Sequence, residues 1–203
     1  MRREDLFSSS ITFHHFFLKT KGDIENLRAL FDLYQGERFK SNYDEKNFER
    51  LIDENRFSDG VGVVYLNNEP VAFCGLTNYK NWTIITRYVV VKFFRMPWAS
   101  GCLFPGIIDV AKSLHRSGVA LTVNEPNTML RDTLTGEKGT RYRGWRYDCI
   151  RDHALFETAN KQPPWVHVEN PIMYRNTKQY LAYISFIPST PPFEYYEEQK
   201  TAT

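Results

Sequence analysis

Residues 82–118 read WTIITRYVVVKFFRMPWASGCLFPGIIDVAKSLHRSG, two apolar stretches with different periods on either side of a short segment that contains arginine, proline and glycine. The first stretch, 82–94, is rich in the β-branched and aromatic residues that favour strands. Its apolar residues fall on both alternating positions, which indicates a central strand buried on both faces or a strand whose phase is shifted by a bulge. The pattern therefore predicts a long strand that ends at the arginine-containing segment.

The second apolar stretch has the period of an amphipathic helix. Its apolar stripe consists of Leu103, Ile107, Val110, Ala111 and Leu114. We expect Pro105 in the first turn, where its missing N–H costs no helical hydrogen bond, and Gly118 as the left-handed C-terminal cap. Such a helix begins with unpaired backbone N–H groups at the positive end of its dipole, so residues 95–101 are predicted to bind an anion. The alternative is an ordinary connection between a strand and a helix.

The composition is that of one globular domain with many aromatic side chains. The chain has 203 residues, among them 15 Phe, 12 Tyr and 4 Trp, and its net charge of +2 does not by itself indicate nucleic-acid binding. The three cysteines lack the spacing of a disulfide framework or a zinc site, so a reducing, cytoplasmic location is expected. The sequence shows no signal peptide, no apolar run of membrane-spanning length and no histidine spacing that predicts a metal site.

Alternating and helical apolar patterns predict the remaining elements, between a polar lead-in at 1–10 and a proline-rich, acidic tail at 188–203. The further strands are expected at 11–19, 61–66, 71–76, 119–123, 145–150 and 179–187. The further helices are expected at 22–35, 43–57 and 128–134. The strands at 61–66 and 71–76 form a hairpin, because the turn residues Asn67 and Asn68 lie between them.

This order of elements resembles the GNAT superfamily of acyl-CoA N-acyltransferases. The matching features are the Asn67–Asn68 hairpin before VAFCGL (71–76), the strand, turn and helix of 82–118, VNEPN (123–127) and the late strand QYLAYISF (179–186), which is similar to strands that close phage-type members. The resemblance implies one α+β (α/β/α) domain over 11–187. Its central sheet is expected to be mixed, mainly antiparallel, with about six to seven strands flanked by helices.

The resemblance implies transfer of an acetyl or other acyl group from acyl-CoA to an amine by direct attack. In that family an Arg-x-x-Gly-x-Gly/Ala turn binds the coenzyme A pyrophosphate, beside a V-shaped opening of the central strand, expected here at Arg95. The matching segment contains Arg95, Trp98, Ala99, Ser100 and Gly101, with Trp98 where the first glycine is expected. Further cofactor contacts are implied for Val89 and Val91 on the strand and for Asn124 or Asn127 after the next one.

Three residues are candidates for the chemistry. Glu125 is a candidate general base, because a carboxylate can accept the proton of an attacking amine, although it can equally complement the dipole of a following helix. Tyr142 is the candidate for the general-acid tyrosine that the family carries on that helix, since no tyrosine occurs between 129 and 139. Tyr88 is a candidate for orienting the substrate, and the alternative is a core tyrosine.

A second hypothesis is a GNAT-like protein without coenzyme A activity that binds or modifies nucleic acid, as phage DNA-modifying proteins of similar fold do. Residues 138–151 interleave basic and aromatic side chains, and Arg141, Arg143 and Arg146 are candidate phosphate contacts. The alternative for this segment is an exposed edge strand kept soluble by charge. A third hypothesis is a non-catalytic interaction protein. The expected partner is an amine acceptor, small or macromolecular; nucleic acid and a homodimer are left open, and no membrane partner is expected.

Overall fold

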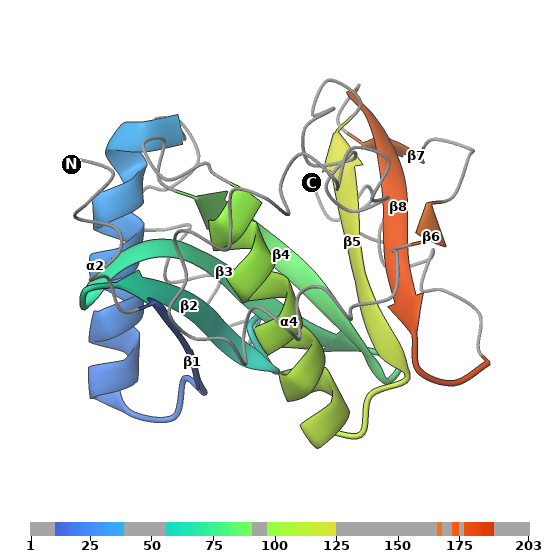
Figure 1. Ribbon diagram of the computed structural model, residues 1–203, viewed down its shortest axis with the longest axis horizontal. Coiled ribbons are helices and arrows are strands. Elements are labelled where there is room, and N and C mark those ends of the chain that lie inside the picture. Colours follow the sequence, from blue (N-terminus) through green and yellow to red (C-terminus); the bar gives the residue numbers. More distant parts are fainter. Residues whose placement is uncertain are drawn as a thin grey trace.

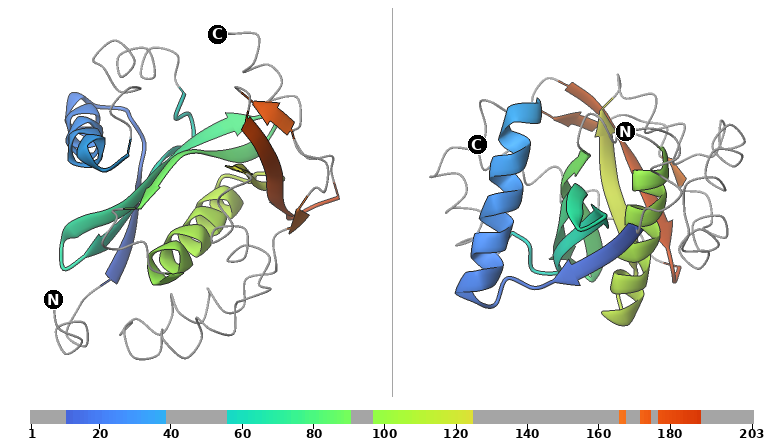
Figure 2. Two further views of the ribbon diagram at one scale, coloured as in Figure 1. Left: turned by 90° about the horizontal axis from the view of Figure 1, so that it is seen from above. Right: turned by 60° about the vertical axis from the view of Figure 1, so that its left-hand side comes forward.

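The computed structural model describes residues 11–38, 56–90, 97–124, 166–167, 172–174 and 177–188. In this part of the chain, two helices lie on opposite faces of one sheet (Figures 1 and 2). The elements are β1 (Ile11–Phe16), α2 (Lys21–Arg38), β2 (Gly60–Leu66), β3 (Glu69–Tyr79), β4 (Trp82–Val90), α4 (Pro97–Ser113), β5 (Gly118–Asn124), β6 (Val166–His167), β7 (Ile172–Tyr174) and β8 (Thr177–Ser185). Neither helix is long and apolar enough to cross a membrane.

The strands form a single mixed sheet. Their order is β1-β2-β3-β4-β5-β8-β6, and β7 also pairs with β8. Every ladder between these strands is antiparallel except the one between β4 and β5, which α4 connects. The expected α+β architecture with a mixed, mainly antiparallel sheet is therefore confirmed. The elements expected at 128–134 and 145–150 lie outside the described residues, as does the helix expected at 43–57 except for residues 56–57, which form a turn.

The two helices lie on opposite faces of the sheet (Figure 2), so they bury different halves of the alternating strand pattern. α4 contributes Leu103, Phe104, Ile107, Ile108 and Ala111 to the larger apolar cluster. α2 contributes Leu27 and Leu30 to a second cluster on the other face. On β2, Val63 belongs to the α2 cluster and the adjacent Val64 to the α4 cluster, as the period of two requires. The sheet is thus the middle layer of three.

Two-residue turns join β2 to β3 and β3 to β4. The φ angles of Asn67 and Asn68 are 51° and 67°, and those of Lys80 and Asn81 are 45° and 66°. Two successive positive φ angles are those of a type I′ turn, whose twist matches that of the paired strands. Asparagine tolerates this region better than most side chains, which is why the predicted Asn67–Asn68 turn forms.

A reciprocal cap begins α2. The Asp23 N–H donates to Thr20 Oγ1 at 3.2 Å, while the Thr20 hydroxyl and backbone N–H each donate to Asp23 Oδ2 at 2.8 Å. This is the capping-box arrangement, with Thr20 as the N-cap residue. The Thr20 hydroxyl, followed by the Thr20 backbone N–H, holds the pKa of the Asp23 carboxyl below its usual value.

The start of α4 differs from the expectation. The helix begins at Pro97, so residues 97–101 are helical and Pro105 lies inside the helix instead of in its first turn. Pro97 is suited to the first helical position, because its φ is already helical and its missing N–H would have had no partner there. Inside the helix, Pro105 costs one backbone hydrogen bond, to the carbonyl of Gly101.

The end of α4 also differs from the expectation. His115, with a φ of 54°, is the left-handed residue, and the N–H groups of His115 and Arg116 donate to the carbonyls of Lys112 and Ala111 at 3.0 and 2.9 Å. These two bonds are those of a Schellman cap. Gly118, predicted as the cap, is instead the first residue of β5. A Cβ there would lie 2.3 Å from the backbone oxygen of Ile184 and 2.5 Å from the Trp82 ring, so close packing explains this glycine.

Candidate functional site

β4 and β5 pair only at their first residues. Their parallel ladder consists of Trp82 with Gly118, Thr83 with Val119 and Ile84 with Ala120, although β4 continues to Val90 and β5 to Asn124. Beyond Ile84 the two strands diverge (Figure 1), β4 remaining paired with β3 and β5 with β8. The divergence was expected at Arg95, which lies outside the described residues; it already begins in the middle of β4.

A bulge lies in β4 just beyond the last pair with β5. Opposite β3, Phe73 pairs with Val89 and Gly75 with Thr86, so β4 contains one extra residue. Arg87 lies at this position with a left-handed φ of 52°, a conformation that costs a non-glycine residue about 1 kcal/mol or more. The extra residue increases the local twist and bends the strand. Bending of β4 at this point is consistent with its departure from β5.

The bulge also changes which residues of β4 face each helix. Before it, Ile85 packs in the α4 cluster; after it, Tyr88 and Val90 do, while Val89 packs in the α2 cluster. Val89 and Val90 are both buried. Both explanations offered for the apolar pattern of this strand, a phase shift and burial on both faces, are therefore confirmed.

The N-terminus of α4 lies toward the open end of the divergence. This follows because α4 connects the end of β4 to the start of β5, as Figure 1 shows. Pro97 has no N–H, and helix geometry leaves the N–H groups of Trp98 and Ala99 without an acceptor inside the helix. These two donors and the helix dipole favour a negatively charged group at this end.

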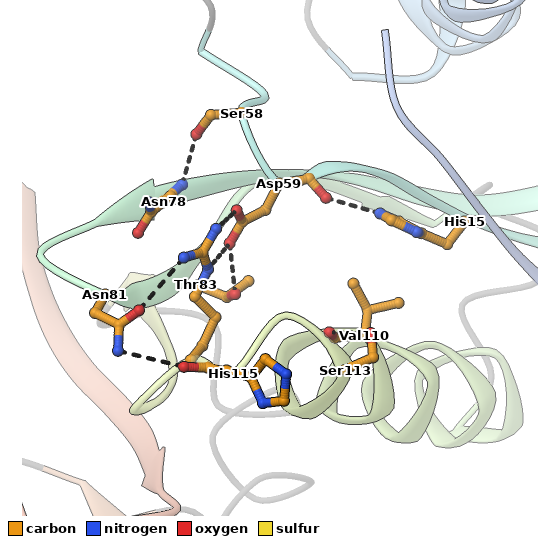
Figure 3. A network of polar contacts seen from close by, with 10 residues as sticks. His15, Ser58, Asp59, Asn78, Asn81, Thr83, Val110, Ser113 and His115 are labelled. Carbon is orange, nitrogen blue, oxygen red and sulfur yellow. Dashed lines mark hydrogen bonds and ion pairs between the residues drawn. The ribbon is translucent and has the colours of Figure 1, made fainter. Parts of the chain in front are cut away.

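A polar network around the buried Asp59 carboxylate lies at the closed end of the divergence (Figure 3). We call it the Asp59 network; its members are Asp59, Asn81, Thr83, Arg116 and Ser117. The Asp59 carboxylate accepts from Arg116 Nε at 3.0 Å, from Arg116 Nη2 at 2.5 Å and from the Thr83 hydroxyl at 2.7 Å. Arg116 Nη1 also donates to Asn81 Oδ1 at 3.3 Å, and the Ser117 N–H donates to the Asn81 carbonyl at 2.7 Å. Through Asp59 and through the turn residue Asn81, the network thus joins the start of β4 to the segment between α4 and β5.

In the ion pair of this network, the carboxylate of Asp59 is shielded from water more completely than the guanidinium of Arg116. The Asp59 side chain is fully buried, and the Arg116 side chain is 19% exposed. Removing one partner of a buried pair commonly costs about 3–5 kcal/mol, because the other charge is left without compensation. The bidentate geometry of the guanidinium also fixes the orientation of both side chains.

The structure places some of the predicted site residues and leaves others undescribed. Tyr88 is half-buried and its ring stacks on Phe104, with centroids 5.5 Å apart and planes at 10°, the packing of a core tyrosine. Asn124 is the last residue of β5, and Trp98, Ala99, Ser100 and Gly101 are in the first turns of α4. The candidates outside the described residues are Val91, Arg95, Glu125, Asn127, Arg141, Tyr142, Arg143 and Arg146. The catalytic and nucleic-acid roles given to these residues stay predictions.

Sequence reasoning missed the Asp59 network. A contact between Arg116 and Asp59 was not predicted, and Asp59 was not singled out. The two residues are 57 positions apart, so no local period connects them. The one local feature of Asp59 is its position directly before the apolar strand β2. Among the described residues, no group of three or more potential metal ligands occurs.

Comparison with solved structures agrees with this geometry. The NatC complex bound to Gag peptide and CoA matches with a TM-score of 0.53 and 12% identity, covering 88% of this chain and 99% of that one. The chain therefore has a GNAT-like fold. An N-acetyltransferase from Staphylococcus aureus Mu50 has a TM-score of 0.52 at 13% identity, over 86% and 97% of the two chains. Spermidine N-acetyltransferase from Vibrio cholerae, in complex with CoA and spermine, has a TM-score of 0.51 at 14% identity, over 87% of this chain and 95% of that one.

Comparisons at the level of sequence give no match. No protein-family model matches the chain, and no curated protein does. At 12–14% identity, the three structural likenesses establish the GNAT fold of this protein and leave its activity to be inferred from its own residues.

Proposed function

We propose that the protein is an acyl-CoA-dependent N-acyltransferase that transfers an acetyl or other acyl group to an amine by direct attack. The observation that carries the proposal is the divergence of β4 from β5 beyond Ile84, with the N-terminus of α4 toward the open end. Where two strands diverge, the backbone N–H and C=O groups between them no longer pair with each other and can instead pair with a ligand. An extended pantetheine chain carries amide groups that can pair with such an edge.

The first turn of α4 fits the charged end of this cofactor. The N–H groups of Trp98 and Ala99, together with the dipole of a 17-residue helix, offer the donors and the partial positive charge that a pyrophosphate requires. Pro97 supplies no donor but fixes the start of the helix. We therefore assign phosphate binding to residues 97–101, with Arg95 as a further cation and with Asn124 or Asn127 as neighbours from the end of β5.

The chemistry follows from what the two strand ends offer. When bound, acyl-CoA supplies an acyl group activated as a thioester. A backbone N–H of β4 near Val89–Val91 donates to the acyl carbonyl and stabilises the negative charge that develops on its oxygen during attack. Holding the amine and the carbonyl carbon at attacking distance supplies much of the remaining acceleration. A C–N bond forms, and the C–S bond breaks with release of the thiolate.

Two proton transfers complete the reaction. Glu125, directly after the last residue of β5, accepts the proton lost by the amine, either itself or through a water molecule. Tyr142 donates a proton to the leaving thiolate. Tyr88, held on the α4 side of β4 by its stacking on Phe104, orients the substrate. These three roles are the proposed assignments for variants to test.

Isothermal titration with acetyl-CoA tests the proposal directly. We expect saturable binding by the wild-type chain and weaker binding by Ala99→Glu, which adds a negative charge in the first turn of α4. Ala99→Gln is the matched control, because it has the same size without the charge. We expect Ala99→Glu to raise Kd at least about tenfold over Ala99→Gln, equivalent to about 1.4 kcal/mol. A carboxylate in the first turn favours the helix itself, so the melting temperature should not fall.

Absence of binding at millimolar acetyl-CoA would refute the proposed function. Equal Kd values for the glutamate and glutamine variants would refute the assignment of the phosphates to α4. If binding is found, thiol release in the presence of amines identifies the acceptor. Peptide N-termini and polyamines are the first acceptors to assay, because a peptide and spermine are present in two of the structures compared above.

A further inference from the structure

We infer that the Asp59 network sets the angle at which β4 and β5 diverge, and that Asp59, Thr83 and Arg116 are thereby positioning residues for the site at the opposite end of α4. The divergence is a feature of the fold alone. The consequence for ligand binding rests on the proposed acyltransferase function.

The network contacts β4, α4 and β5, the three elements of the candidate site, at the closed end of the divergence. Thr83 belongs to the ladder between β4 and β5, one residue before its last pair. Arg116 is the residue that closes the Schellman cap of α4, two residues before β5 begins. Both side chains donate to the same carboxylate. A change in the position of Asp59 relative to Thr83 or Arg116 therefore changes the angles between β4, α4 and β5 at the closed end.

Asp59 is itself fixed to the antiparallel half of the sheet. Its N–H donates to the carbonyl of Leu76 in β3 at 2.9 Å, and its carbonyl accepts from His15 Nε2 of β1 at 2.7 Å (Figure 3). Its side chain is completely buried, so it has no room for an alternative rotamer exposed to water. The network therefore connects the diverging elements to β1 and β3, and not merely to one another.

The ladder is a short connection between the two parts of the sheet, in which β4 is paired with β3 and β5 with β8. It contains three residue pairs, whereas β4 continues for six residues beyond Ile84 and α4 has 17 residues. Six residues of strand extend about 20 Å, and 17 residues of helix about 25 Å. A rotation of about 5° at the closed end would displace the far end of either element by about 2 Å, and displacements of about 1 Å can cost about 100-fold in rate.

Three variants separate positioning from simple stabilisation. Thr83→Val removes one hydrogen bond to Asp59 without changing the shape of the side chain. Arg116→Lys keeps the charge but loses the bidentate geometry. Leu27→Ala is the control, because Leu27 packs in the α2 cluster, which contains no residue of the network, and its truncation lowers stability through a cavity. The melting temperature of each variant is measured first, so that the comparisons are made at known stability.

Hydrogen exchange followed by mass spectrometry is the primary readout. We expect Thr83→Val and Arg116→Lys to speed exchange at least about tenfold in the peptides covering 82–84 and 118–120, with little change in β1 and β2. Leu27→Ala should instead speed exchange in α2 and in the strands beneath it. If the two network variants leave exchange at the β4–β5 ladder unchanged, or if Leu27→Ala changes it equally, the inference is wrong.

Titration with acetyl-CoA is the second readout. Kd should rise at least about fivefold in Thr83→Val and Arg116→Lys, and should stay within about twofold of wild type in Leu27→Ala at equal or greater loss of melting temperature. Equal changes in Kd for all three variants would reduce the network to a stabilising role and overturn the inference. If the wild-type protein does not bind acetyl-CoA, the proposed function fails, and the exchange experiment alone then decides whether the network sets the divergence.

Discussion

Replacing Gly118 by alanine tests the close meeting of β4, β5 and β8 at the closed end of the divergence. The new Cβ would lie 2.3 Å from the Ile184 backbone oxygen and 2.5 Å from the Trp82 ring. Ile184 belongs to the ladder between β5 and β8, so its carbonyl cannot turn away without breaking strand pairing. Overpacking of this kind costs about 1–3 kcal/mol, and a clash with backbone places it near the upper end.

The expected change in melting temperature follows from the length of the chain. For a domain of about 200 residues, 1 kcal/mol corresponds to about 2–4 °C, so Gly118→Ala should lower the melting temperature by about 6–12 °C. Thermal unfolding followed by circular dichroism measures this. Gly22→Ala is the control, since the nearest atom to a Cβ there is Thr20 Oγ1 at 3.7 Å. Alanine is favoured over glycine in a helix by about 0.5–1 kcal/mol, so that variant should gain about 1–4 °C.

A Gly118→Ala protein that melts at or above the wild-type temperature would refute the close packing on which this prediction depends. The same result would remove the physical reason given for a glycine at the first residue of β5. A drop in both variants would indicate a general sensitivity to substitution, and would equally contradict the assignment of the effect to the β4–β5–β8 contact.

Three further predictions concern the caps and the buried thiol. His115→Gly should raise the free energy of unfolding by about 1 kcal/mol in urea titrations, because glycine adopts the left-handed cap conformation without strain; a loss of stability would contradict the cap. The lowered pKa of Asp23 means that its carboxylate stabilises the fold above the ordinary value of 3.8, and that this contribution is lost as the pH falls from there through the folded-state pKa. Asp23→Asn should therefore be less stable than wild type at pH 7 and should lack this part of the pH dependence, whereas parallel pH profiles in urea unfolding would rule the cap contribution out. Complete burial raises the pKa of the Cys74 thiol, so iodoacetamide should label Cys74 in urea but not in the native protein, as peptide mass spectrometry would show; labelling at equal rates would contradict its burial.

Local patterns were sufficient to predict the elements that depend on their own residues. The β-branched run that begins at Trp82 forms β4, the helical spacing from Leu103 forms the buried face of α4, and Asn67–Asn68 forms the predicted turn. The apolar residues on both alternating positions of β4 predicted a bulge or burial on both faces, and both occur. In each case the period or turn chemistry acts within a few residues, which is the range that a single sequence reveals.

Most of the predictions that failed depend on contacts between residues far apart in the sequence. Gly118 was predicted as a cap because glycine is the usual left-handed residue, but its role is set by Trp82 and Ile184, which no local pattern connects to it. Pro105 was placed in the first turn because the helix was expected to start later, whereas Pro97 starts it. The point at which β4 leaves β5 depends on the position of the bulge and on the register between strands. The apolar pattern allowed a bulge, but its position and the register are set by contacts with residues distant in the sequence. The Asp59–Arg116 pair was missed for the same reason.

Backbone amide NMR of the isotope-labelled protein, titrated with coenzyme A, tests most directly whether the diverging ends of β4 and β5 and the first turn of α4 form the ligand site. We predict that the largest amide shift changes fall at Trp98, Ala99 and the residues of β4 beyond the bulge, with β1 and α2 little affected. Shift changes confined to β1 and α2, or none at saturating coenzyme A, would contradict the assignment of this site.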